Sequence, residues 1–265
     1  MMQSWRPPIV SAPPLFVGMA LAALVLLAGG ACAKPVADNG NNNNGNGNNN
    51  AGNVFNENFT AANGSNWPGE WMPISTSRVN ADIQDNRGRL QCDAPPIVAR
   101  VVSTTLAMMN FEATFTIRFG DFANQGIGFY GRQNGGHLMT TVPNGQGFAI
   151  FTEGSGVSDF GLWEETSGTE NEVFGVAGPL VAGGILNDTD YRVRYRVQQV
   201  SGTQTLLQAR IWPAADSEPG TWTVEYTSST SVLQNLTGGF AVDLYNYSGS
   251  GSITIDDIQI TDLGS

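Results

Sequence analysis

Two glutamates in the second half of the sequence could do acid–base chemistry. Glu170 and Glu172 stand two positions apart, so an extended backbone would place both carboxylates on one face. Two carboxylates that share a face could divide the roles of acid and base in cleaving a glycosidic bond. The pair lies between Gly168 and Gly175, however, and we expect a solvated loop there rather than a catalytic strand.

The remaining candidates for catalysis are weaker. Glu164 and Glu165 are adjacent and would point to opposite faces of a strand. His137 is the only histidine of the chain, which excludes a multi-histidine metal site, and no Gly-x-Ser-x-Gly motif accompanies it. We therefore name no catalytic residue and expect His137 to be partly exposed at a hairpin, where it could contact a ligand.

An aromatic side chain in a glycine-rich stretch is the best candidate for ligand contact. Trp163 lies near Asp159, and we expect its indole ring to be exposed. A flat apolar ring can stack on the C–H face of a sugar while polar neighbours set the orientation. We predict a ligand site made of Trp163, Asp159, Tyr130 and His137. The other tryptophans, including Trp222 in a cleanly alternating run, are expected in the core.

Two adjacent acids, Asp256 and Asp257, interrupt the last apolar run. Ile253 and Ile255 follow one alternation, whereas Ile258 and Ile260 follow the opposite one. This change of phase predicts a β-bulge or a switch of face at the two aspartates. A carboxylate at such a place needs a counter-charge or a cation.

The elements that position these residues are predicted to be strands. Phe111 to Phe119 and Tyr191 to Val197 alternate apolar and polar residues, which is the period of a half-buried strand. The arginines at 192, 194 and 196 would form a row on one face, paired with acidic neighbours. A dozen or so such strands with no helical period predict an all-β fold, a two-sheet antiparallel jelly-roll sandwich.

The N-terminal region predicts export. Residues 1–33 carry an apolar run from Leu15 to Leu27 that is too short to span a bilayer, and Cys32 follows it. Either Cys32 becomes the lipidated first residue of a bacterial lipoprotein, which we favour, or the chain is cut after Ala33 and secreted. Residues 34–53 are rich in Asn and Gly, and we expect a disordered linker.

The remaining residues, 54–265, are predicted to form one domain. They hold 22 acidic residues against ten arginines, a formal charge of −12, which argues against nucleic acid as a partner.

Several segments together carry a resemblance to a known family. They are Phe55 to Phe59, Tyr191 to Tyr195, Ala209 to Trp222 and Ile255 to Ile260. The domain resembles the concanavalin A-like lectin/glucanase (LamG-like) jelly rolls of bacterial exported proteins. The resemblance implies a fold with a concave sheet that often faces carbohydrate, and this fold is compatible with enzymes, lectins and spacers. The Glu-x-Asp-x-x-Glu pattern of the glucanase members is incomplete here.

The resemblance also implies a structural Ca²⁺. In such modules a closing Asp and an acid of the first strand hold the ion with oxygen ligands, and Glu57, Asp256 and Asp257 would be the matching residues. The alternative is a pair of aspartates bonded to arginine and backbone amides.

We accordingly predict an exported, lipid-anchored bacterial surface protein with a non-catalytic jelly-roll domain that binds glycan or another cell-surface ligand. The alternatives are a divergent glycoside hydrolase or polysaccharide lyase, and a structural spacer.

Overall fold

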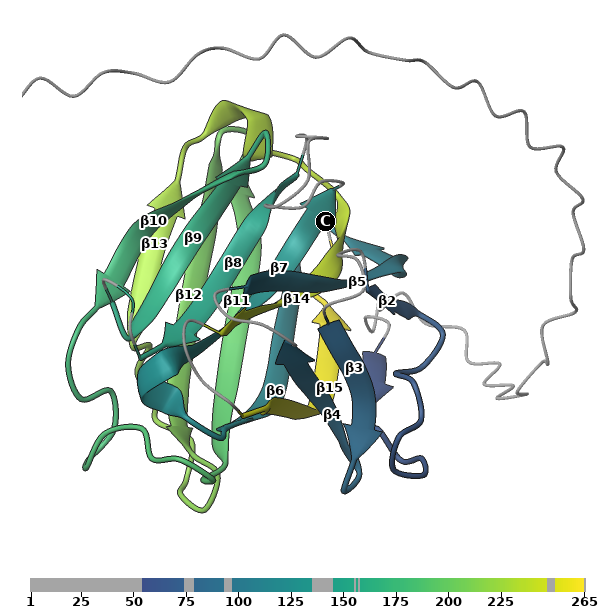
Figure 1. Cartoon of the computed structure of the whole chain (residues 1–265). Coiled ribbons are helices and arrows are strands. Elements are labelled where there is room, and N and C mark those ends of the chain that lie inside the picture. The colour runs from purple at the N-terminus through teal and green to yellow at the C-terminus, as the bar shows by residue number, and fades with distance from the viewer. Residues whose placement is uncertain are drawn as a thin grey trace, which may run out of the picture. The chain divides into compact units, whose positions relative to one another are not determined.

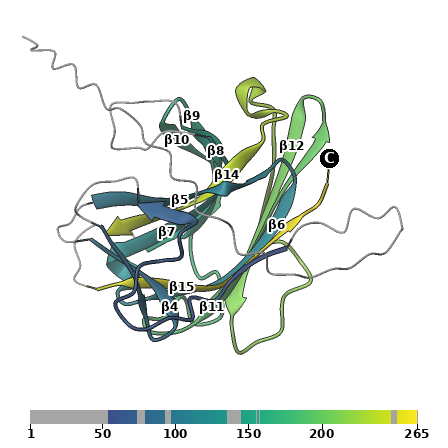
Figure 2. The ribbon, with the colours of Figure 1, turned by 90° about the vertical axis from the view of Figure 1, so that its right-hand side faces the viewer.

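The computed structural model describes residues 54–73, 79–92, 97–134, 145–154, 156, 158–246 and 251–264. Two antiparallel sheets pack face to face (Figures 1 and 2), which confirms the predicted sandwich. No helix among these residues is both long and apolar enough to cross a membrane. The predicted export signal, Cys32, the linker and His137 lie outside the described residues.

The first layer is an eight-stranded sheet. Its hydrogen-bonded order is β13 (Val224–Ser228), β12 (Gln204–Pro213), β11 (Tyr191–Ser201), β6 (Phe111–Phe119), β15 (Ile253–Asp262), β4 (Arg87–Cys92) and β3 (Val79–Gln84), with β1 (Val54–Glu57) also pairing with β15.

The second layer is a seven-stranded sheet. Its order is β10 (Thr169–Val176), β9 (Phe160–Thr166), β8 (Gln146–Glu153), β7 (Gln125–Asn134), β14 (Gly238–Asn246), β5 (Ile97–Met108) and β2 (Trp71–Pro73). Two single-turn 3₁₀ segments, Phe122–Asn124 and Ser231–Leu233, complete the elements.

The core lies between the two sheets and follows the alternation of the strands. Phe111, Phe115 and Phe119 of β6 are buried there, and the ring of Phe115 stacks on that of Phe129 from the opposite sheet at 4.5 Å between centroids. Burial of a large aromatic side chain contributes on the order of 1.5–3 kcal/mol. The period-2 pattern of the sequence therefore specifies which face of each strand meets the other sheet.

A bulge divides the last strand, as the change of phase predicted. The register of β15 against β6 shifts between Asp256 and Gln259, and Asp257 has a φ of 49°, in the left-handed region that Asp tolerates better than most residues. On the other edge of β15, β4 pairs up to Ile255 and β1 pairs from Ile258 onward. The bulge thus turns Asp257 outward and returns Ile258 to the core.

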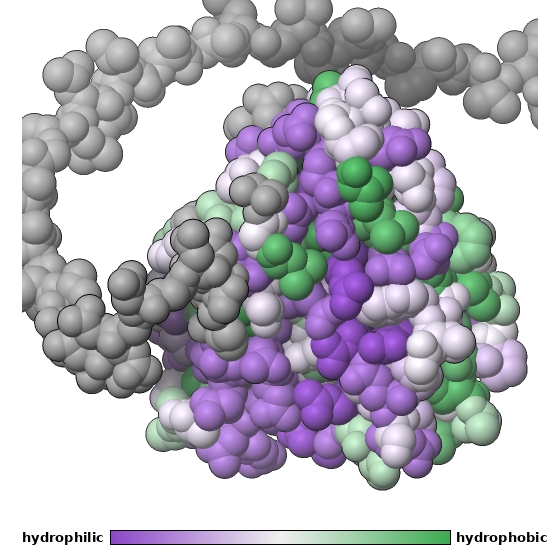
Figure 3. All heavy atoms as spheres, turned by 180° about the vertical axis from the view of Figure 1, so that it is seen from behind, coloured by the Kyte–Doolittle hydropathy of each residue, from purple (hydrophilic) through white to green (hydrophobic). Residues whose placement is uncertain are grey.

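The outer face of the eight-stranded sheet is mainly hydrophilic (Figure 3). Glu112 of β6 pairs with both Arg194 and Arg196 of β11, so these two arginines follow the predicted pairing with acidic cross-strand neighbours. Trp222 does not lie in the core as predicted. It precedes β13, and the guanidinium carbons of Arg196 and Arg210 lie 5.2 and 4.4 Å from its ring centroid.

Candidate functional site

The outer face of the seven-stranded sheet carries a row of three aromatic rings, one on each of β7, β8 and β9. Ring centroids of Tyr130 and Phe151 are 5.6 Å apart, and those of Phe151 and Trp163 are 5.2 Å apart. Phe151 stands opposite Gly128 and Gly161 in the register. A Cβ atom on Gly128 would lie 2.4 Å from Cζ of Phe151, so the absence of a side chain there lets the ring lie across the neighbouring strand.

The members of this aromatic row differ in exposure. Tyr130 and Phe151 are buried, with 0% and 2% of their surface exposed, whereas Trp163 is half-buried. The guanidinium carbon of Arg100 lies 4.3 Å from the centroid of the Tyr130 ring, in cation–π contact. Tyr130, which we predicted as a ligand contact, is therefore part of the buried base of the row, and Trp163 is less exposed than expected.

Trp163 and Glu172 form a cross-strand pair between β9 and β10. A Cβ atom on Gly161 would lie 3.1 Å from Trp163 Nε1 and 3.2 Å from Glu172 Cδ. The indole and the carboxyl group therefore both lie over the backbone of Gly161, which has no side chain. The Oγ of Ser158 donates to Glu172 Oε1 at 2.6 Å. Trp163 Nε1, a donor, and Glu172 Oε2, an acceptor, are both buried atoms without a hydrogen-bond partner. We call this pair the Trp163–Glu172 site.

Beside the aromatic row, three carboxylates converge on one guanidinium. Arg100 Nε and Nη2 donate to the two oxygens of Asp243 at 2.6 and 2.8 Å. Its Nη1 donates to Glu165 at 2.9 Å and its Nη2 to Glu170 at 2.8 Å. The side chains of Arg100, Asp243 and Glu165 are 0% exposed and that of Glu170 is 4% exposed. We call these four residues the Arg100 cluster.

Burial and mutual repulsion govern proton binding in the Arg100 cluster. Burial, reinforced by the charge of Asp243 and opposed by Arg100, raises the pKa of Glu170 to about 8. Burial also raises the pKa of Glu165, against the stabilising effect of Arg100. Three carboxylates around one cation leave an excess of negative charge, so a proton on Glu170 relieves the repulsion.

The expectation of a solvated loop at Glu170 and Glu172 was wrong. Both residues belong to β10 and face the same side as Trp163 and Glu165 through the cross-strand register. The predicted opposite orientation of Glu164 and Glu165 is confirmed, because Glu165 joins Arg100 whereas Glu164 Oε2 accepts from the Thr230 hydroxyl at 2.6 Å. Packing against the rest of the sheet, rather than local composition, makes this segment a strand.

Asp159 supports a loop next to the Trp163–Glu172 site. Its Oδ2 accepts from the backbone N–H of Gly178 at 3.0 Å, and its backbone N–H donates to the carbonyl of Val176 at 3.0 Å. Asp159, which we predicted to contact a ligand, thus holds the end of β10 in place. His137, the fourth residue of the predicted set, lies outside the described residues.

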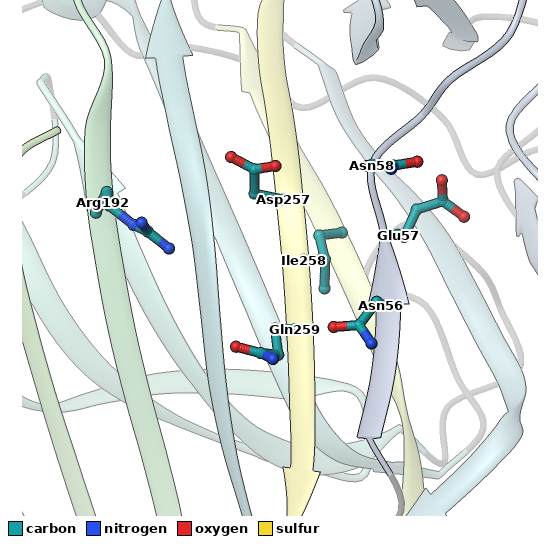
Figure 4. Close-up of a pocket in the computed structure, with 7 residues that line it drawn as sticks. All are labelled: Asn56, Glu57, Asn58, Arg192, Asp257, Ile258 and Gln259. Atoms are coloured by element: carbon teal, nitrogen blue, oxygen red, sulfur yellow. The ribbon is translucent and has the colours of Figure 1, made fainter.

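The structure does not support the predicted calcium ligands. Glu57 Oε1 accepts from the Phe59 N–H at 2.6 Å, and Asp256 Oδ1 accepts from the Asp257 N–H at 2.8 Å. The carboxylates of Glu57 and Asp257 point in opposite directions (Figure 4). In the part of the chain that the structure describes, no group of three or more His, Cys, Asp or Glu side chains could hold a metal ion.

Sequence reasoning missed Arg100 and Asp243, although a signal was present. Both are charged residues inside apolar runs that form neighbouring strands, and the two face each other in the register. A charge in such a run is buried only when it is paired. An arginine in one apolar strand and an aspartate in another could therefore have been proposed as partners.

The comparisons with known proteins show similarity of fold. No family model and no curated protein matches the sequence. The exoplasmic/lumenal domain of VIP36 in its Ca²⁺-bound form is 14% identical with a TM-score of 0.52, covering 80% of this chain and 90% of that chain. Its Ca²⁺/Man-bound form has a TM-score of 0.50 at 14% identity, with coverage of 80% and 90%.

A carbohydrate-binding module from Bacillus subtilis matches with a TM-score of 0.48 at 9% identity, covering 73% of this chain and 96% of that chain. The fold is a concanavalin A-like jelly roll, as the sequence resemblance implied.

Proposed function

We propose that this protein is an exported glycan-binding module and that the Trp163–Glu172 site contacts the sugar. The observation that carries the proposal is the cross-strand pairing of a half-buried indole with the half-buried side chain of Glu172 on the outer face of the sheet. Aromatic faces pack against sugar C–H groups, and a carboxylate accepts from sugar hydroxyls. The hydrogen bond from Ser158 to Glu172 Oε1 fixes the orientation of that carboxylate before a ligand binds. This reduces the side-chain entropy that is lost on binding.

The fold supports the same class of ligand. VIP36, with which this chain shares the fold, is described in a mannose-bound form together with Ca²⁺. Among the described residues, Glu57, Asp256 and Asp257 form no group that could hold a metal ion, and the proposal for Trp163 invokes none.

The hydrolase alternative rests on the Arg100 cluster. Glu165 and Glu170 lie close enough to bind one guanidinium, and the pKa of Glu170 is raised to about 8 by burial, which suits a general acid. Both carboxylates are nevertheless buried and bound to Arg100. A glycosidase needs its two carboxylates open to the sugar and to water, so we favour binding without cleavage.

Affinity electrophoresis of the full chain in gels that contain mannan, laminarin, xylan or pectin tests the function. We expect retardation in at least one gel, with no release of reducing ends. Trp163→Ala should weaken the retardation up to about tenfold in apparent affinity, because a stacked aromatic contributes about 0.5–1.5 kcal/mol beyond the area it buries. Trp222→Phe, a change on the other sheet, is the matched control. Equal retardation of Trp163→Ala and wild type would place the sugar elsewhere.

Location at the cell surface is part of the proposal. The support is the order of the sequence: an apolar run from Leu15, then Cys32, then an Asn-rich tract. This order suits a lipid-held domain that needs a spacer from the membrane surface.

A further inference from the structure

The opposite face of the sandwich has a cavity of its own. It has a volume of about 390 Å³ and is lined by side chains from β1, β11 and β15 (Figure 4). Small-molecule sites commonly occupy about 300–1,000 Å³. Its polar lining residues are Asn56, Glu57, Asn58, Arg192, Asp257 and Gln259.

The register of the eight-stranded sheet explains the hollow. On β6, which lies between β11 and β15, Thr116 pairs with Arg192 and Thr114 pairs with Gln259. The side chains of these two threonines are short, whereas those of Arg192 and Gln259 on the flanking strands are long. The molecular surface over β6 is therefore lower than the surface over β11 and β15. The bulge adds Asp257 to the rim, because it turns that residue outward. Figure 4 shows Arg192 and Asp257 on opposite sides of this hollow.

Arg192 differs from the other arginines. Of those among the described residues, it is the one whose guanidinium makes no ion pair and no hydrogen bond. Its neighbours on β11, Arg194 and Arg196, both pair with Glu112. The Nε atom of Arg192 is buried without a partner, which is costly unless a ligand accepts from it. The cavity therefore offers a guanidinium with unused donors.

The amide side chains add both donors and acceptors. Asn56 and Gln259 pair with each other across β1 and β15, and both are exposed. Each primary amide can donate through nitrogen and accept through oxygen. A sugar hydroxyl also donates and accepts, so two neighbouring hydroxyls match an array of amides, guanidinium and carboxylate.

The charges around the cavity favour a neutral ligand. Arg192 carries one positive charge, whereas Asp257 and Glu57 of the same lining carry two negative charges, and residues 54–265 have a formal charge of −12. An anionic sugar would be repelled by this field. An uncharged polyhydroxyl ligand meets no such cost.

We propose that this cavity is a second carbohydrate site, one without an aromatic platform, that binds the vicinal hydroxyls of a neutral sugar through Arg192, Asp257, Asn56 and Gln259. The residues of this second site are separate from Trp163 and Glu172, and the proposal does not require the Trp163–Glu172 site. Two sites on opposite faces of one domain would allow a single chain to bridge two glycan strands, which raises avidity without new contacts.

The test is a titration of the isotope-labelled full chain with D-mannose, D-glucose or D-galactose at millimolar concentration, followed by NMR. The Nε–H signal of Arg192 and the side-chain amides of Asn56 and Gln259 report the cavity, and the indole N–H of Trp163 reports the other site. We expect at least one sugar to shift the cavity signals. Arg192→Gln should weaken this response about tenfold or more, the size expected for hydrogen bonds to a charged group. Arg89→Gln, whose parent side chain is paired with Asp82, is the matched control.

Each outcome separates the two proposals. Cavity shifts that persist in Trp163→Ala support an independent second site, even where the Trp163 signal itself never moves and the first proposal fails. The second-site proposal is overturned when none of the three sugars moves the cavity signals, or when those shifts disappear in Trp163→Ala.

Discussion

Arg100 and Asp243 lie 143 residues apart in sequence and form a two-point ion pair, with Nε–Oδ1 at 2.6 Å and Nη2–Oδ2 at 2.8 Å. Both side chains are fully buried, and they face each other across β5 and β14. Two further carboxylates share the guanidinium, so this one cation neutralises acids from three strands of the seven-stranded sheet.

Removing that cation should destabilise the domain strongly. Arg100→Met leaves the carboxylates of Asp243 and Glu165 buried without a counter-charge, and breaking a buried pair costs about 3–5 kcal/mol. Urea unfolding at pH 7 measures the loss. The matched change Arg89→Met removes a surface pair with Asp82, worth about 0–1 kcal/mol. Similar midpoints for the two variants would contradict a stabilising role for the cluster.

The pH dependence of stability should report Glu170. Burial raises its folded-state pKa from the ordinary 4.5 to about 8, so the folded protein binds a proton that the unfolded chain releases. The resulting stabilisation is complete below pH 4.5 and is lost as the pH rises through about 8. Glu170→Gln should flatten the stability curve between those values in denaturant titrations. An unchanged slope in Glu170→Gln would refute the assignment.

A methyl group under the aromatic row should disturb packing. Gly128→Ala places a Cβ atom 2.4 Å from Phe151 Cζ, and overpacking of this kind costs about 1–3 kcal/mol. Thermal unfolding gives the loss, and tryptophan emission should shift because Phe151 supports Trp163. Gly69→Ala, where no atom lies within 4 Å of the added Cβ, should be close to wild type. Equal melting temperatures for the two variants would show that the row can rearrange freely.

Chelation should leave the fold intact. Within the described ranges of the chain, Glu57, Asp256 and Asp257 form no group that could hold a metal ion, so no metal-binding energy at that place should contribute to stability. We expect the same melting temperature with EDTA and with added CaCl₂. A fall in melting temperature with EDTA, restored by Ca²⁺, would reinstate the calcium site that the sequence resemblance implied.

Lipidation can be tested at one residue. If Cys32 carries the lipid, wild-type chain expressed in a bacterium should partition into detergent and incorporate labelled palmitate. Cys32→Ala should lose both properties while keeping the folded domain. Cys92→Ala changes the other cysteine of the chain and serves as the control. Release of unlabelled wild-type protein into the medium would favour cleavage after Ala33.

The sequence by itself determined the two-sheet sandwich and the bulge at Asp256 and Asp257. Both follow from the period of two, a local property, because alternation decides which face of each strand is apolar. The same alternation predicts that the arginines of β11 face outward. Arg194 and Arg196 form ion pairs with an acidic cross-strand neighbour, as predicted.

Only the tertiary structure decided which distant side chains meet. The register between β9 and β10 brings Glu172 to Trp163, and the sheet brings Arg100 to acids on three other strands. Likewise, nothing near Arg192 in the sequence distinguishes it from Arg194, yet the bulge on β15 and the threonines of β6 place it in a cavity. Strand order and register are long-range choices, made by the burial of the whole core, and no local pattern encodes them.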